Sequence, residues 1–366
     1  MTKAKRLDTT QGIDTALGEL LAGFLGDGPF DTVLAPIRAR IGASYAAVTD
    51  PERLREATTI PATMPVHGAK AVQSLTHRSA GKRTVVAMRI CEIRAAVELS
   101  KLKQAALEDL VFLSFDCPGV TPLPQALDAK SAAQAEAPPD KRPLCQICEH
   151  FAPMEDERAR NVDLHIGTLG IEKDDAILVA VTPAGEEILA SLQLDDATAE
   201  DIEAWQSAVG TLRNDRLEKR ERVFSDLLEY ARGIDGLATV FERCIECRNC
   251  QSVCPICYCR LCFADRGTIN DTPADMLQQA DAAGAVRPAQ DPLLFHLGRI
   301  AHMSLSCVSC GMCEDACPVD IPVGRVVSSV SEETRRLFDY VAGRSPDEAL
   351  PLVRFEQQEL TELEDA

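Results

Sequence analysis

Two cysteine runs with the same spacing dominate the C-terminal third of this 366-residue chain. Both follow the pattern C-x2-C-x2-C-x3-C-P, and together they contain Cys244, Cys247, Cys250, Cys254, Cys307, Cys310, Cys313 and Cys317. In a run of this kind the first three thiolates bind three corners of one [4Fe–4S] cubane, and the fourth reaches the cluster of a second run. The repeat therefore predicts two clusters that exchange one ligand each.

This ligand exchange divides the eight thiols into two sets. The first set is Cys244, Cys247, Cys250 and Cys317, and the second set is Cys307, Cys310, Cys313 and Cys254. Zinc sites also use C-x2-C pairs, but ordinarily with four ligands for each ion rather than two complete runs of this length. Iron–sulfur ligation in a two-cluster ferredoxin-type domain is therefore the better interpretation.

Three further thiols lie between the runs, in the sequence PICYCRLC of residues 255–262. Cys257, Cys259 and Cys262 are not needed for the two clusters. They could ligate an additional cluster with one ligand from outside, or they could be buried without a metal. Free cysteine is selected for reactivity more often than for packing, which favours the ligand role.

Charge and apolar pattern exclude several classes of protein. Lys and Arg number 38 against 57 Asp and Glu, and the resulting net charge of −19 repels nucleic acids and anionic membranes. No apolar run reaches the roughly 20 residues that span a bilayer, and no signal-peptide core follows the N-terminus. We therefore expect a cytoplasmic protein with reduced, metal-bound cysteines, no membrane span and no nucleic-acid partner.

The N-terminal part alternates helix and strand patterns, which predicts an α/β domain. Residues 13–25 are amphipathic, residues 32–37 are apolar, and Asp50-Pro51 can open a helix. The pattern gives no strand before residue 13.

A clearer unit follows at residues 84–115. Apolar strands are expected at 84–90 and 110–115, with a helix at 92–104 between them. This pattern is typical of a right-handed βαβ crossover with two buried parallel strands.

Later segments set the domain limits. A strand at 176–181 and a helix at 186–192 continue the α/β domain, and Thr198 can cap a charged helix that runs to about residue 232. We predict an α/β domain at 1–195, a helical connector at 196–238, an α-rich dicluster domain at 239–345 and a tail at 346–366.

Four N-terminal cysteines form a separate candidate set. Cys91 and Cys117 each follow a predicted parallel strand, so both should emerge at the carboxyl edge of the sheet, where α/β proteins place ligands. Cys145 and Cys148 form a C-x2-C pair, which alone could be redox-active, bind zinc or supply half of a cluster site. Together the four thiols could hold a third cluster, and we call them the proximal set.

Several segments resemble the coenzyme F420 hydrogenase/dehydrogenase beta-subunit family. MRICEIRA at 88–95, FDCPG at 115–119 and LCQIC at 144–148 are similar to the segments that supply its proximal cluster. VDLHIGTLG at 162–170 and FHLGRIAHM at 295–303 extend the similarity, and the two cysteine runs resemble the C-terminal extension of the formate dehydrogenase beta subunit.

The resemblance implies FAD beside the proximal cluster, with flavin contacts in the turn before Ile13, at residues 58–65 and around Cys91. No G-x-G-x-x-G fingerprint follows a strand. Residues 120–142 also depart from the family, because this segment is shorter and richer in Pro and Ala.

The resemblance also implies that the chain is the electron-transfer subunit of an oxidoreductase. It would link a formate dehydrogenase alpha-type subunit, or a hydrogenase, to coenzyme F420, ferredoxin or a heterodisulfide-reductase-type module. An independent ferredoxin-like shuttle and a zinc-stabilised scaffold are the alternatives. We find no catalytic residues for substrate chemistry. His165 could tune the proximal cluster or transfer a proton, but a lone histidine is more often structural, so it is assigned no role. His296 and His302 are interpreted in the same way, and Trp205 is expected to pack the connector helix.

Overall fold

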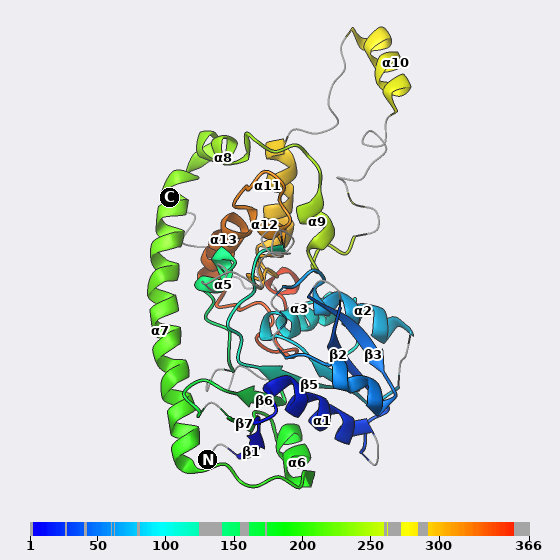
Figure 1. Cartoon of the computed structure of the whole chain (residues 1–366). Coiled ribbons are helices and arrows are strands. Elements are labelled where there is room, and N and C mark those ends of the chain that lie inside the picture. The colour runs from blue at the N-terminus through cyan, green and yellow to red at the C-terminus, as the bar shows by residue number, and fades with distance from the viewer. Residues whose placement is uncertain are drawn as a thin grey trace, which may run out of the picture.

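The computed structural model describes residues 3–354 apart from 26–27, 40–41, 60, 62, 79–80, 124–140, 154–160, 173, 260–261, 263–271 and 285–291. A mixed sheet fills the N-terminal half, and short helices of the C-terminal half stack beyond one of its edges (Figure 1). The strands are β1 (Ala4–Asp8), β2 (Thr32–Arg38), β3 (Ala43–Val48), β4 (Thr84–Ala87), β5 (Leu110–Phe115), β6 (Leu164–Gly167) and β7 (Asp175–Ala180).

The sheet has the strand order β1-β7-β6-β5-β4-β2-β3. Strands β2, β4, β5 and β6 are parallel to one another, and β3 and β7 flank them in the antiparallel direction. β1 pairs antiparallel with β7 at the edge and therefore runs in the same direction as the central strands. The predicted βαβ unit is present as β4, helix α3 (Ile90–Lys101) and β5. This confirms the mixed α/β character of the N-terminal region.

Helices cover both faces of the sheet. Helix α1 (Ile13–Leu25), the 3-10 helix η1 (Pro51–Glu56) and α6 (Pro183–Ser191) share one buried apolar cluster with the strands. Helices α2 (Gly68–Arg78) and α3 pack in a second cluster that also contains Phe295, Val308 and Val327. Because this second core includes residues of both halves, the limits drawn between the domains stay a prediction.

Three strands were not predicted. The expectation that no strand precedes residue 13 was wrong, because β1 pairs with β7 at the edge of the sheet. Its sequence AKRLD is charged, and Arg6 forms an ion pair with Asp175 on the neighbouring strand at 2.6 Å. β3 and β6 were missed as well. The strand expected at 84–90 ends at Ala87, since Glu92 accepts a hydrogen bond from the Arg89 amide and begins α3.

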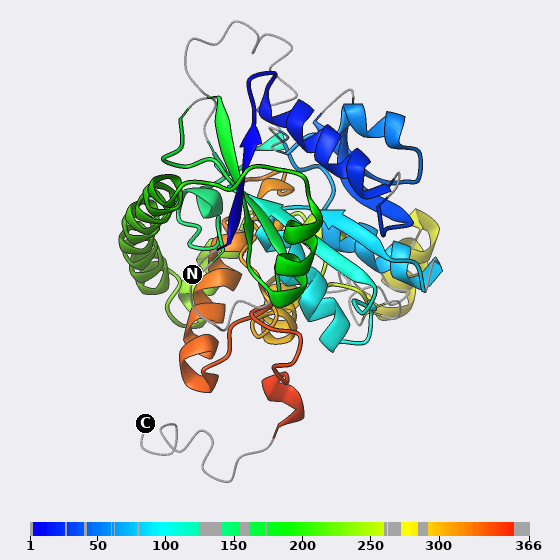
Figure 2. The same ribbon diagram turned by 90° about the horizontal axis from the view of Figure 1, so that it is seen from below.

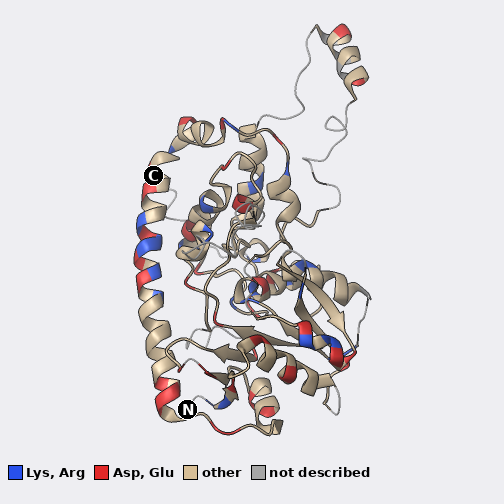
Figure 3. Ribbon diagram, in the orientation of Figure 1, with Lys and Arg blue, Asp and Glu red and all other residues tan. Residues whose placement is uncertain are grey.

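The predicted helix after Thr198 is α7 (Ala199–Tyr230), which runs alongside both halves of the molecule (Figure 1). Seen from below, α7 lies at one side of the sheet and α1 and α2 at the other (Figure 2). Acidic residues gather at its beginning, and farther along the helix basic residues alternate with acidic ones (Figure 3). Thr198 and Asp201 form a reciprocal cap at its start, as the sequence predicted.

The C-terminal half consists of short helices and loops. After α7 they are α8 (Gly233–Phe241), α9 (Asn249–Val253), α10 (Pro273–Ala283), α11 (Pro292–Met303), α12 (Met312–Asp315), α13 (Val323–Phe338) and η5 (Pro351–Val353). One further short helix, α5 (Pro143–Gln146), lies between β5 and β6. Helix α10 stands apart from the body of the protein (Figure 1). Most of the segment at 120–142 lies outside the described residues. Among the described helices, none combines the length and apolarity that a membrane span requires.

Candidate functional site

The two cysteine runs adopt the same backbone conformation. Glu246 and Ser309 occupy equivalent positions, with φ of 54° and 57°, and Arg248 and Gly311 do so as well, with φ of 60° and 76°. Left-handed residues other than glycine are uncommon and need a structural reason. A short helix, α9 or α12, then carries the third cysteine of each run. The chain therefore turns in the same way around each expected cluster.

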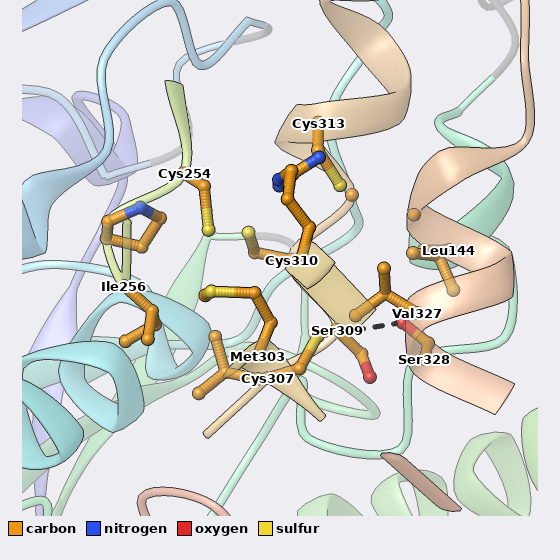
Figure 4. Close-up of a pocket in the computed structure, with 15 residues that line it drawn as sticks. Leu144, Cys254, Ile256, Met303, Cys307, Ser309, Cys310, Cys313, Val327 and Ser328 are labelled. Atoms are coloured by element: carbon orange, nitrogen blue, oxygen red, sulfur yellow. Dashed lines mark hydrogen bonds between the residues drawn. The ribbon is translucent and has the colours of Figure 1, made fainter. Parts of the chain in front are cut away.

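The structure brings the second set together. Cys254, Cys307, Cys310 and Cys313 line one cavity, as Figure 4 shows, although Cys254 comes from the other run. Apolar side chains, including Ile256, Met303 and Val327, complete the wall. The structure therefore places Cys254 beside the three cysteines of the other run, as the predicted ligand exchange requires.

The four cysteines of the first set also lie near one another, and this set is closer to the protein surface than the second set. Burial raises the pKa of Cys250, Arg299 opposes this shift, and the nearby Cys244, Cys247 and Cys317 raise the pKa further. Cys317 accepts a hydrogen bond from the Ile321 amide at 3.4 Å. Cys247 is exposed, whereas Cys250 is buried.

The proximal set meets at the carboxyl edge of the sheet, as predicted. Cys91 lies at the start of α3, Cys117 follows β5, and Cys145 and Cys148 come from α5 and the residues just after it. All four line one cavity. Burial raises the pKa of Cys148 to about 11. Such sheltered thiols fit a cluster, because bound iron stabilises the thiolate form that burial alone disfavours.

The proximal and second cavities adjoin. Cys310, Ser309 and Leu144 line both of them. Arg142 links the segment that carries Cys145 and Cys148 to the second run. Its guanidinium pairs with Asp315 at 2.5 Å and donates to the carbonyl oxygen of Cys310 at 3.4 Å. Both side chains of this pair are almost fully buried. No local sequence pattern indicates this pair, because the two residues lie 173 positions apart.

The three extra cysteines differ in exposure: Cys259 is exposed, whereas Cys257 and Cys262 are partly buried. Cys257 packs with its sulfur 3.6 Å from that of Met303. Cys259 is exposed and lines a cavity of about 530 Å³ with His77 and Lys103, and neither Cys257 nor Cys262 is among the described residues of that wall. Their role as ligands stays a prediction.

Among the residues that the structure describes, no three His, Cys, Asp or Glu side chains surround a single ion. A cubane cluster differs from a single-ion site in that each of its thiolates binds a different iron atom. Its four sulfur ligands are therefore spaced around the cluster and do not converge on one point.

His165 has a structural environment. Its ring nitrogens contact Ser114 Oγ at 2.6 Å and Asp116 Oδ1 at 2.9 Å, inside the sheet. Burial alone would raise the pKa of Asp116, but the His165 hydrogen bond and two backbone amides lower it. Trp205 Nε1 also donates to Asp116, at 3.1 Å, and its ring covers Gly167. The packing role expected for Trp205 matches this position.

His296 has a contact that the sequence did not predict. Its Nε2 lies 3.4 Å from Cys244 Sγ, and its ring stacks on Phe241 with centroids 3.9 Å apart. Burial lowers the pKa of His296 to about 4, so the ring is neutral near pH 7. A neutral imidazole N–H can still donate to a thiolate.

Trp205→Phe should lower the melting temperature of the protein. Phenylalanine keeps most of the apolar packing but leaves Asp116 without one buried donor, which costs about 1–3 kcal/mol. Tyr230→Phe is the control, because it removes an exposed hydroxyl near the end of the same helix. Equal melting temperatures for the two variants would contradict the role of the Trp205 hydrogen bond.

Comparisons with known proteins agree with this geometry. A family model described as a 4Fe-4S dicluster domain matches residues 239–321. The F420-dependent formate dehydrogenase subunit beta of Methanocaldococcus jannaschii is 25% identical over 318 residues, 74% of this chain and 76% of that protein. The F420-dependent formate dehydrogenase 1 subunit beta of Methanococcus maripaludis is 26% identical over 319 residues, covering 74% and 75%.

A solved structure of the F420-reducing [NiFe] hydrogenase complex from Methanosarcina barkeri is similar in part. It matches with a TM-score of 0.48 and 14% identity, covering 64% of this chain and 93% of that one. The relatives and the family model confirm the resemblance seen in the sequence: most of the chain is similar to F420-dependent formate dehydrogenase beta subunits, and residues 239–321 match a 4Fe-4S dicluster domain.

Proposed function

We propose that this chain is the FAD- and iron–sulfur-containing electron-transfer subunit of a formate dehydrogenase-type complex. It would pass electrons between a catalytic subunit and an acceptor such as coenzyme F420, ferredoxin or a heterodisulfide-reductase-type module. The observation that carries this proposal is that the proximal and second cysteine sets line adjoining cavities with Cys310 in the common wall.

The order of the three sets supports a relay. The proximal set adjoins the second set through Cys310, and the second set exchanges its fourth cysteine with the first set. When bound, each cluster takes up and releases one electron at a time. The three cysteine sets follow one another in space, from the edge of the sheet to the exposed Cys247.

Buried polar atoms near the proximal set support a flavin site. Thr63 Oγ1, His67 Nε2, Arg89 Nε and Thr121 Oγ1 have no hydrogen-bond partner among the described residues. A buried polar atom without a partner costs about 1–3 kcal/mol, so a bound polar group is expected there. Arg89 lines the proximal cavity and donates through Nη2 to the Pro61 carbonyl oxygen at 2.7 Å. These atoms fit the polar groups of a nucleotide cofactor.

Two of the segments in which the resemblance implies flavin contacts lie close to each other. The Thr59 amide donates to Asp14 Oδ1 at 2.8 Å, which holds the segment at 58–65 against the start of α1 and the turn at Gly12. Residues 60 and 62 of this segment lie outside the described part of the chain. β1 is present before residue 13, which supports an intact α/β domain around these segments.

FAD exchanges either one or two electrons, so it would match single-electron clusters to a two-electron acceptor. Denaturing the anaerobically purified protein should therefore release flavin in about equal amount to the chain. A supernatant without flavin, from protein with its full iron content, would contradict the flavin proposal and leave the cluster proposal standing.

The partner is tested by isolating the complex anaerobically through a tag on this chain. We expect a formate dehydrogenase catalytic subunit to co-purify, and formate to bleach the iron–sulfur absorbance of the complex. Bleaching by hydrogen instead would favour the hydrogenase-linked alternative. Full iron content without any partner would favour an independent shuttle, and zinc without iron would favour a scaffold.

A further inference from the structure

Arg299 lies between the two cysteine sets of the dicluster domain. It belongs to α11 and is 5% exposed. Its Nη2 donates to the carbonyl oxygen of Cys250 in the first set at 3.2 Å, and the same side chain lines the cavity of the second set. Nη2 also lies 4.0 Å from Cys257 Sγ.

Two donors of the Arg299 side chain have no partner among the described residues. The Nε and Nη1 atoms of Arg299 are buried and make no hydrogen bond within the part of the chain that the structure describes. Nor does any described Asp or Glu form an ion pair with it. An arginine is almost never fully buried unless it is paired. The groups that can place negative charge beside the guanidinium are the thiolate forms of four cysteines, Cys250, Cys257, Cys313 and Cys254.

Arg142 makes the contrast clear, because it also lies beside the second cavity. Its guanidinium pairs with Asp315, and it donates to the Met64 and Cys310 carbonyl oxygens. The charge of Arg142 is therefore already compensated by protein groups. Arg299 has no carboxylate partner among the described residues, and apart from the Phe295 ring 5.9 Å from its guanidinium carbon, its contacts are with the cysteine sets.

We propose that Arg299 is a positioning residue that supplies positive charge and two N–H donors to the cluster held by Cys254, Cys307, Cys310 and Cys313. This rests on the proposed function, since it requires that the second set binds a cluster. Reduction adds negative charge, and hydrogen bonds and nearby cations favour the reduced form. Arg299 therefore raises the reduction potential of this cluster and makes it a better electron acceptor.

The variants are Arg299→Gln, which removes the charge, and Arg299→Lys, which keeps the charge but loses the planar fork of donors. Arg336→Gln is the control, because Arg336 is exposed on α13 and pairs only with Glu333 among the described residues. Each is prepared anaerobically as the whole complex. Iron content is measured first, followed by a redox titration monitored by electron paramagnetic resonance.

For Arg299→Gln we expect full iron content and a ratio of reduced to oxidised cluster about tenfold lower at the wild-type midpoint, a shift of about 59 mV for one electron. Arg299→Lys should shift the same signal in the same direction by a smaller factor, and Arg336→Gln should not shift it. Unmoved potentials in whichever Arg299 variant keeps its iron would overturn the proposal. Loss of iron from both Arg299 variants, with Arg336→Gln intact, would also overturn it in favour of an assembly role. Absence of cluster signals in the unmodified protein would instead refute the proposed function.

Discussion

Cys313→Ser is expected to remove one cluster and to stop electron transfer through the chain. Cys313 lines the second cavity, which lies between the proximal set and the first set. Serine is a harder ligand than thiolate and is a poor substitute at iron–sulfur sites. About four iron atoms should therefore be lost from each chain. Because the second set occupies the middle of the relay, transfer between the two ends should stop.

Cys250→Ser is the matched comparison, because it affects the first set only. It should also remove about four iron atoms, but the signals of the proximal and second clusters should remain. Iron analysis and electron paramagnetic resonance of both anaerobic variants give the measurement. Unchanged iron content and unchanged transfer in both would refute the assignment of the two runs.

Arg142→Met should destabilise the protein by about 3–5 kcal/mol, because it leaves the buried Asp315 charge without its partner. The two side chains are 2% and 5% exposed and lie 2.5 Å apart. Asp315 would keep only the backbone donor of Leu123 at 3.0 Å among the contacts described. The pair also joins the segment that carries Cys145 to α12 of the second run. Its loss should therefore loosen the contact between the proximal and second sets.

The double variant Arg142→Met with Asp315→Leu separates charge from packing. Replacing both members of a buried pair by apolar residues is often neutral, so most of the lost stability should return. Arg325→Met is the control, since its pair with Glu314 is partly exposed and contributes less, about 1 kcal/mol at most. Thermal melting under anaerobic conditions is the readout. A double variant as unstable as Arg142→Met would contradict this explanation.

The sequence predicted those features that depend on local spacing. The spacing within each cysteine run determines which side chains meet, because each run forms one compact turn. In the structure, both runs have left-handed backbone conformations at the same two positions. The proximal set could be predicted because Cys91 and Cys117 follow parallel strands of one unit. Strands β4 and β5 were found because they form continuous apolar runs.

Features that depend on distant partners could not be predicted. β1 contains three charged residues, which are stabilised at the sheet edge by pairing with β7. The arginines beside the clusters, Arg142 and Arg299, have contacts far away in the sequence, so neither produces a local pattern. His296 faces Cys244 only because α11 packs against α8.

Iron and acid-labile sulfide analysis of the anaerobically purified chain tests the central claim most directly. The three cysteine sets predict at least about twelve atoms of each per chain, in three clusters with four thiolate ligands apiece. A content of about eight would contradict the presence of a third cluster, and zinc in place of iron would contradict the account as a whole.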